Sequence, residues 1–148
     1  MYALMRLTLD TNILISSLMT EDTPPALLYR AWKNERFSLI TSKEQLAELT
    51  RVLAYPKLKP FINPFEAREL VAGLAIHAII ASGLPVISHS SDPSDNIILA
   101  TAIKGHCNFL VTGDKKDLLA LKKIEEVSII TARTAIEILE KPAFDSGH

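Results

Sequence analysis

The sequence predicts an α/β protein, a three-layer α/β/α sandwich around a central, mostly parallel sheet of four or five strands. Short apolar runs alternate with helical patterns along the whole chain. These runs are nearly continuous in Val, Ile and Leu, which is typical of strands covered on both faces. No Gly/Ser-rich linker or internal repeat divides the 148 residues. We therefore expect a single domain over residues 1–142 and a disordered tail at residues 143–148.

Five short apolar runs are the predicted strands of this sheet. The first run is apolar at Leu7 and Leu9 and ends on a carboxylate, Asp10. In chain order, the predicted strands cover residues 4–10, 37–40, 85–87, 108–112 and 127–131. Because parallel strands need crossover connections, we expect right-handed helical crossovers between them.

Helices between these strands are predicted from their start and stop signals. Ser42 followed by Gln45 is a capping box, and Tyr55-Pro56 ends the helix that it starts. At a later helix, Asp92 is placed as the N-cap before a proline at the first helical position. The predicted helices cover residues 24–34, 42–54, 66–82 and 92–104, a short stretch from 114, and residues 133–140.

Composition and charge exclude several classes of protein. Hydrophobic residues make up 48% and charged residues 22%, which excludes a disordered chain. The net charge of −1 excludes binding of nucleic acid by bulk charge, although a local basic groove stays open. The single cysteine, Cys107, makes neither an internal disulfide nor a zinc cluster, which indicates a reducing compartment. Arg6 and Asp10 come too early for the apolar core of a signal peptide. Residues 70–91 are interrupted by His77, Gly83 and Pro85, so we expect no membrane span and a cytoplasmic protein.

Three carboxylates mark the edge of the sheet where a ligand site is expected. Asp10 and Asp114 each follow the carboxyl end of a predicted strand, and Asp95 opens the helix that leads into the fourth strand. Ligand sites of open parallel sheets lie beyond the carboxyl ends of the strands. Asp95 shares a helix face with Leu99 and Ala102, so its side chain should point inward.

A fourth acid is expected from the helix after the second strand, which offers Glu44 and Glu48. Glu48 lies nearer the buried stripe of this helix, at its rim, and is the candidate. Carboxylates brought together repel one another unless a cation lies among them, and Mg²⁺ or Mn²⁺ prefers such oxygen ligands. Since a divalent ion polarises a phosphodiester and activates water, the four acids predict metal-assisted phosphoryl chemistry.

Most of these acids also have a simpler interpretation as helix caps. Asp92 is most simply an N-cap, and Asp95 fits the third-position acid of the same capping box. Asp114 and Asp117 would form a second box. Asp10 is the exception, because it ends an apolar strand and no predicted helix begins there for it to cap. The four histidines are scattered without ligand spacing, so a histidine metal site is not expected.

Taken in order, these segments resemble the PIN-domain ribonucleases over about residues 5–140. In that family a first strand ends in an Asp, as in LTLDTNILIS (residues 7–16). A helical acid follows, as in SKEQLAEL (residues 42–49). The third acid heads a helix, as in DPSDNIILATA (residues 92–102), and the fourth lies in a turn, as in LVTGDKKDLL (residues 110–119).

The resemblance implies a set of catalytic, metal-binding acids: Asp10, Glu48, Asp95 and Asp114. Asn12 and Thr112 match positions that usually orient those acids, whereas Asp92 and Asp117 match less constant acidic positions. It also implies endoribonuclease activity on single-stranded or structured RNA that depends on Mg²⁺ or Mn²⁺, and a homodimer. The chain looks closest to the toxins of toxin–antitoxin pairs, which implies a small antitoxin protein as partner.

Basic residues around these acids are candidate phosphate contacts, and each also fits a solvated surface: Lys43, Arg51, Lys57, Lys59, Lys115 and Lys116. Two other functions stay open. A haloacid-dehalogenase-like phosphatase has an acidic motif similar to GDKKD (residues 113–117), but it needs an Asp where this chain has Asn12. A non-catalytic module that binds RNA or a protein partner would have a degenerate site. Release of phosphate from small phosphomonoesters discriminates the phosphatase, and nuclease activity of the purified protein decides against the non-catalytic module.

Overall fold

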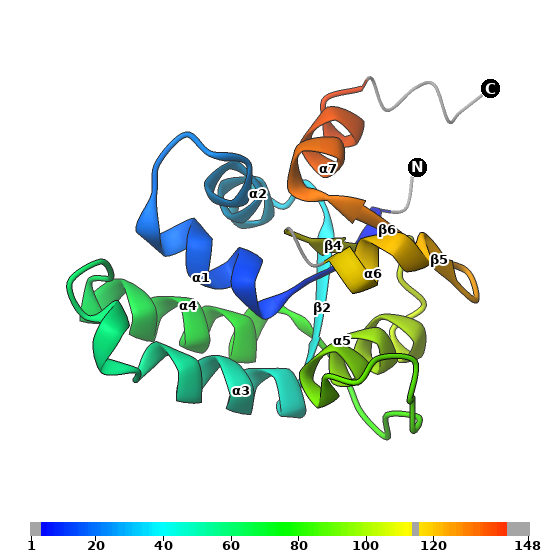
Figure 1. Cartoon of the computed structure of the whole chain (residues 1–148). Coiled ribbons are helices and arrows are strands. Elements are labelled where there is room, and N and C mark those ends of the chain that lie inside the picture. Colours follow the sequence, from blue (N-terminus) through cyan, green and yellow to red (C-terminus); the bar gives the residue numbers. More distant parts are fainter. Residues whose placement is uncertain (1–3, 114–115, 142–148) are drawn as a thin grey trace.

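A computed structural model describes residues 4–113 and 116–141 of the chain. Figure 1 shows helices on both sides of a central sheet. The described residues form six strands, seven α-helices and one 3₁₀ helix. In chain order, the elements are β1 (Arg6–Leu9), α1 (Thr11–Met19), α2 (Pro24–Lys33), β2 (Ser38–Ser42), α3 (Lys43–Leu53), the 3₁₀ helix η1 (Pro56–Leu58), α4 (Pro64–His77), β3 (Ile79–Ala81), α5 (Pro93–Lys104), β4 (Phe109–Thr112), α6 (Lys116–Leu121), β5 (Lys123–Ile124), β6 (Val127–Thr131) and α7 (Ala132–Leu139).

The strands lie in the order β3-β2-β1-β4-β6-β5. Each neighbouring pair from β3 to β6 is parallel, and β5 runs antiparallel to β6. β1 and β4 are therefore adjacent in the middle of the sheet, and their carboxyl ends lie at the same edge. The predicted three-layer fold with a mostly parallel sheet is confirmed, and the first strand is central as expected.

Successive residues of the strands face two hydrophobic cores, one on each side of the sheet. Leu7 and Leu9 point toward α1, α2, α4 and α7. Ile40 and Leu110 point toward α5 and α6. The central strands β1, β2 and β4 are covered on both faces, and their buried residues are apolar residues, threonines and one serine, which is typical of parallel sheets.

The sheet differs from the prediction at two strands. Residues 85–87 form no strand, and Val86 is 98% exposed. The edge strand is instead β3. The helix predicted at residues 66–82 is observed as α4, which begins at Pro64 and already ends at His77, and β3 follows it within the predicted helical range. The β-branched pair Ile79-Ile80 pairs with β2 in parallel register, and this pairing favours an extended backbone. The short strand β5 forms a hairpin with β6, so the sheet has six strands rather than four or five.

The sequence prediction lacks helix α1, which follows β1 directly. Nine residues are too few for a clear helical period, and the Ile and Ser residues within α1 have modest helix propensity. Tertiary packing supplies the stability, because Ile13 and Leu14 are buried in the core. Asp10 is the N-cap of this helix, so the interpretation that no cap explains Asp10 is wrong.

Some predictions fall on parts of the chain outside the described residues. The predicted tail at residues 143–148 lies there, and so does Asp114, the first residue of the predicted fifth helix. The described part of that helix, α6, begins at Lys116. Among the described residues, no helix combines the length and the apolar character needed to cross a membrane.

Candidate active site

Asp10 lies at the carboxyl end of central strand β1 and is 1% exposed. Its backbone N–H donates to the Val111 carbonyl over 2.9 Å, which extends the pairing of β1 with β4 by one residue. At the end of β4, Thr112 Oγ1 donates to Asp10 Oδ2 over 2.8 Å. Thr112 is 0% exposed, so water does not compete for this hydrogen bond. Thr112 thus has the contact with Asp10 that the resemblance implies.

Asp10 is also held by the amino end of α1. Its Oδ1 accepts a long hydrogen bond, 3.4 Å, from the backbone N–H of Asn12. The partial positive charge of a helix amino end stabilises a carboxylate at this position. The side chain of Asn12 is exposed, so the contribution of Asn12 to Asp10 comes from its backbone rather than from its amide group.

Glu48 reaches the same edge through the residue that follows Asp10. Thr11 Oγ1 donates to Glu48 Oε1 over 2.6 Å, and this hydrogen bond joins α1 to α3. Thr11 is buried, while Glu48 is half-buried, at the rim of the core as expected. A short hydrogen bond to a carboxylate fixes its direction. Asp10 and Glu48 are therefore held by neighbouring residues of one strand–helix junction.

A buried glutamine fixes α3 against the sheet beneath the acids. Gln45 Nε2 donates to the Leu9 carbonyl over 2.7 Å, and Gln45 Oε1 accepts from Thr41 Oγ1 over 2.6 Å. Ser42 caps α3 as predicted, because its Oγ accepts from the Gln45 N–H. The reciprocal half of the predicted capping box does not form, since the Gln45 side chain binds β1 and β2 instead.

Asp95 lies in the first turn of α5 and is 4% exposed, pointing inward as predicted. Its Oδ2 accepts from Ser90 Oγ over 3.2 Å. Asp92 is the N-cap, because its Oδ1 accepts from the Ser94 N–H over 2.9 Å. The Asp92 N–H donates to Ser90 Oγ, so Asp95 is not the reciprocal acid of a capping box. Asp95 is thus buried without a capping role to account for it.

These residues come from elements that pack against one another. α5 packs against β1 and α3, and α3 packs against α1. Figure 1 shows the β1–α1 junction lying above the adjacent amino ends of α3 and α5. Thr11, which follows Asp10 in the chain, binds Glu48, and Asp95 is buried on α5, which contacts both β1 and α3.

Across residues 4–113 and 116–141, no three His, Cys, Asp or Glu side chains are close enough together to hold a metal ion. Because Asp114 lies outside these ranges, the convergence of all four acids stays a prediction.

Two further acidic residues differ in their surroundings. Asp117 is exposed in the first turn of α6. Glu44 lies one helical turn before Glu48 on α3, and its Oε1 is buried without a hydrogen-bond partner. An unpaired buried carboxylate oxygen is costly, so Glu44 adds negative charge near Glu48 that hydrogen bonds do not compensate.

Sequence reasoning missed two hydroxyl residues that hold the acids, Thr11 and Ser90. Recognising a helix that starts at Thr11 would have placed its side chain at the strand–helix junction. Ser90 lies in the loop before α5, and no local pattern distinguishes it from its neighbour Ser91.

A mostly parallel α/β sheet with buried acids at its carboxyl edge places the chain among α/β proteins with an acidic site. Comparison with known families identifies the family within this class. A family model described as PIN domain matches residues 6–116, a range that contains all four predicted acids. The chain therefore belongs to the PIN-domain family. PIN domains are generally nucleases, hence hydrolases, and typically use divalent metal ions. A search among curated proteins finds no match to this chain.

Proposed function

We propose that this protein is a divalent-metal-dependent endoribonuclease that hydrolyses RNA phosphodiester bonds. The observation that carries the proposal is the junction of β1 and α1, where Asp10 is buried and held by Thr112, and where Thr11 holds Glu48. A carboxylate that is buried and held in one direction by hydrogen bonds is prepared to act as a ligand. The nuclease activity that is general among PIN domains supports a catalytic use of this carboxylate.

The oxygen ligands at this edge fit Mg²⁺ or Mn²⁺. Carboxylates are the ligands that these hard cations prefer. The unpartnered buried Oε1 of Glu44, one turn from Glu48, supports a cation at this edge, because a positive charge would offset the cost of its burial. The residues that we expect to hold the ion are Asp10, Glu48, Asp95 and Asp114.

A divalent ion bound there supplies Lewis-acid polarisation of the phosphodiester and lowers the pKa of water. The protein's own residues keep the ligands oriented, since Thr112 holds Asp10, Thr11 holds Glu48 and Ser90 holds Asp95. Glu48, at the rim, positions water or a second ion. Direct attack by water needs no protein nucleophile, so the products should carry 5′-phosphate and 3′-hydroxyl ends.

The variant Asp10→Asn tests the proposal, because it keeps the shape of the side chain and its ability to cap α1 but removes a charge. Wild-type protein should cleave a mixed RNA pool with Mg²⁺ or Mn²⁺ and should stop when a chelator is added. Asp10→Asn should cleave slower by orders of magnitude and retain its circular dichroism spectrum. Activity that resists the chelator, or cyclic-phosphate product ends, would contradict this mechanism.

We also propose that the protein is the cytoplasmic toxin of a toxin–antitoxin pair and forms a homodimer. The resemblance to that subgroup supports this role, and a small antitoxin protein is the partner that it implies. Expression of the wild type should arrest bacterial growth, whereas expression of Asp10→Asn should not. Equal growth with both proteins would exclude the toxin role, and a monomeric mass by light scattering would exclude the dimer.

The alternative functions have less support. A haloacid-dehalogenase-like phosphatase requires an acid two residues after Asp10, where the chain has the exposed Asn12. Release of phosphate from small phosphomonoesters would nevertheless favour it. A non-catalytic binding module would be indicated if the purified wild-type protein bound RNA but cleaved none.

A further inference from the structure

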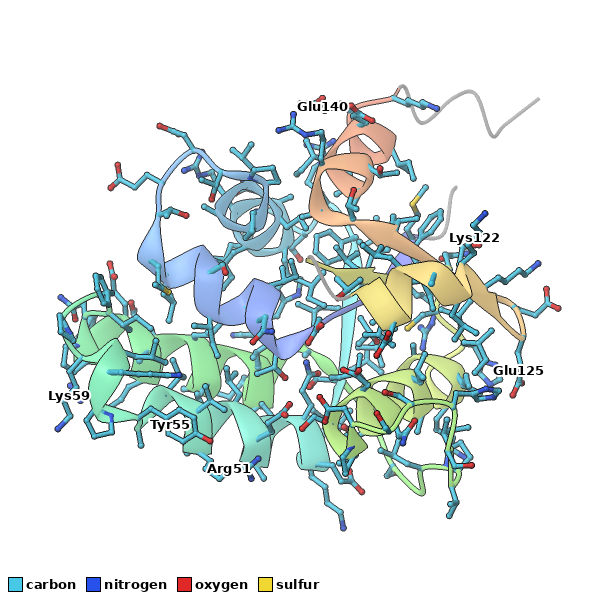
Figure 2. The ribbon with its side chains drawn as sticks, in the orientation of Figure 1. Arg51, Tyr55, Lys59, Lys122, Glu125 and Glu140 are labelled. Carbon is cyan, nitrogen blue, oxygen red and sulfur yellow. The ribbon has the colours of Figure 1, made fainter. Side chains whose placement is uncertain are left out.

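Helix α3 has a polar residue among those that it buries against the sheet. Its buried residues are Gln45 and Leu49, whereas Figure 2 shows Arg51 projecting outward from the same helix. Leu49 packs in the hydrophobic core, but Gln45, one helical turn before it and 0% exposed, brings an amide group into the same buried stripe. Burial of an amide costs free energy unless the amide is hydrogen-bonded, so its partners indicate what it does there.

The amide of Gln45 joins the carboxyl ends of β1 and β2. The register of these two strands ends at the pair of Leu7 and Leu39. Beyond this pair, Gln45 Nε2 donates to the Leu9 carbonyl of β1, and Gln45 Oε1 accepts from Thr41 Oγ1 of β2. One side chain of α3 therefore holds both strands at the edge of the sheet where the acids lie.

These hydrogen bonds connect the segments that carry two of the proposed metal ligands. Leu9 directly precedes Asp10, and Glu48 follows Gln45 by three residues, so Glu48 is a neighbour of Gln45 on α3. Asp10 is fixed without α3, because its backbone continues the pairing with β4 and its carboxylate accepts from Thr112. The position of Glu48 relative to Asp10 therefore depends on how α3 is held.

Gln45 and Thr11 hold different parts of this arrangement. Thr11 fixes the carboxylate of Glu48, whereas Gln45 fixes the backbone from which that side chain extends. A metal ligand must be held within about 0.5 Å of its productive geometry. A buried polar group whose hydrogen bonds are satisfied specifies one arrangement of the elements that it joins. The amide of Gln45 meets this requirement for Glu48.

We propose that Gln45 is a positioning residue. Its amide sets the separation of the Glu48 and Asp10 carboxylates and thereby the affinity of the site for a divalent ion. Gln45 acts through Glu48 and is not itself a ligand of the ion. This inference rests on the proposed metal-dependent function and adds to it a residue outside the predicted set of acids.

The test measures Mn²⁺ binding to metal-free, full-length protein by electron paramagnetic resonance, without RNA. Gln45→Met keeps an unbranched side chain and removes both side-chain hydrogen bonds. The dissociation constant of Mn²⁺ should rise about tenfold or more. In the Glu48→Gln background, Gln45→Met should weaken Mn²⁺ binding further by no more than about twofold, because the ligand through which Gln45 acts is already lost.

Thr41→Val is a milder variant of the same contact, because it removes one of the two hydrogen bonds of the amide. Its affinity for Mn²⁺ should lie between those of wild type and Gln45→Met. If Gln45→Met fails to fold, Thr41→Val decides the question, and it should bind Mn²⁺ more than about twofold more weakly than wild type.

Thr8→Val is the matched control for the loss of a buried hydrogen bond. Thr8 is 0% exposed, and its Oγ1 donates to the Ile40 carbonyl, which joins β1 to β2 without α3. Like Gln45→Met, this variant should lower the urea midpoint of unfolding, but it should bind Mn²⁺ within about twofold of wild type.

Glu125→Gln controls for Mn²⁺ bound by surface carboxylates. Glu125 is exposed, and Figure 2 shows it on the opposite side of the molecule from Lys59, which follows α3. Its removal should change Mn²⁺ binding by less than about twofold.

Three results would overturn the positioning role. The first is unchanged Mn²⁺ affinity of folded Gln45→Met. The second is equal weakening by Gln45→Met and Thr8→Val, because general loosening of the sheet would then explain the loss. The third is equal weakening by Gln45→Met in the wild-type and Glu48→Gln backgrounds, because Gln45 would then not act through Glu48.

The outcomes also separate this inference from the ribonuclease proposal. Mn²⁺ binding that depends on Gln45, without any cleavage of RNA, keeps the positioning role and rejects the nuclease. Cleavage of RNA by wild-type protein, together with unchanged Mn²⁺ affinity of Gln45→Met, keeps the nuclease and rejects the positioning role. Absence of Mn²⁺ binding by the wild type overturns both.

Discussion

The hydrogen bond from Thr112 to Asp10 can be removed with little change in shape by replacing Thr112 with Val. Both side chains are buried, so Asp10 Oδ2 has no access to water as a replacement donor. A hydrogen bond to a charged group contributes about 1.5–3 kcal/mol to stability. The added methyl group offsets about 0.8 kcal/mol of this. The free energy of unfolding should therefore fall by roughly 1–2 kcal/mol, and the melting temperature by roughly 2–8 °C.

Catalysis should fall as well, because Asp10 would no longer be held in one orientation. Loss of a residue that orients a metal ligand typically costs about 10–100-fold in metal affinity or activity. Urea denaturation followed by circular dichroism measures the stability of Thr112→Val, and metal-dependent RNA cleavage measures its activity. Thr50→Val is the matched control, because Thr50 donates to the Leu46 carbonyl at an exposed position and should change stability by less than about 0.5 kcal/mol.

A double-mutant cycle with Asp10→Asn isolates the hydrogen bond itself. In the Asp10→Asn background, Thr112→Val should cost less by about 1 kcal/mol, because the hydrogen bond that is lost there is to a neutral group. If Thr112→Val lowered the free energy of unfolding equally in the wild-type and Asp10→Asn proteins, the lost stability could not be assigned to the hydrogen bond between Thr112 and Asp10. A Thr112→Val protein as stable and as active as the wild type would show that this hydrogen bond neither stabilises the fold nor orients Asp10 for catalysis.

Three further predictions concern the acids, the packing and the buried thiol. Glu48→Gln should lower cleavage of RNA at least tenfold. It should change the free energy of unfolding by less than about 1 kcal/mol, because a Gln oxygen still accepts the hydrogen bond from Thr11. Wild-type activity of this variant would contradict the role of Glu48. Gly105→Ala should lower the free energy of unfolding by about 1–3 kcal/mol in urea denaturation, since a Cβ there would lie 2.5 Å from Ile40 Cγ2; an unchanged midpoint would contradict this packing. Burial raises the pKa of the Cys107 thiol above its ordinary value of 9.0, so the unfolded chain ionises first. The resulting stabilisation of the folded state is complete below pH 9.0 and is lost as the pH rises through the pKa of the folded protein. In Cys107→Ala, the free energy of unfolding should fall less steeply with pH in this range. Identical profiles of unfolding free energy against pH for the two proteins would contradict this prediction.

The features that could be predicted are those that short segments specify. Ser42 and Asp92 cap α3 and α5 because a cap depends only on the side chain and the next three residues. The strands around Leu9 and Val111 were recognisable because residues covered on both faces must nearly all be apolar. The inward orientation of Asp95 followed from its helical spacing to apolar residues.

The features that could not be predicted depend on residues far away in the chain. Ile79 and Ile80 lie at the end of a helical pattern, and they form a strand because β2 offers a partner at that edge. Gln45 fits a capping box by its spacing, but its side chain binds the Leu9 carbonyl 36 residues away. Helix α1 depends on the core that it covers more than on its own propensity.

By itself, the sequence determined the layered fold, the family and the order of the acids, because strand and helix patterns and motif spacing are local properties. The tertiary structure decided what holds each carboxylate. Thr112 reaches Asp10 across 102 residues, and Thr11 reaches Glu48 across 37. These contacts arise because β1 and β4 end side by side in one sheet and because α1 packs on α3. No local pattern encodes such pairing, since its free energy is gained only when distant segments of the chain are packed together.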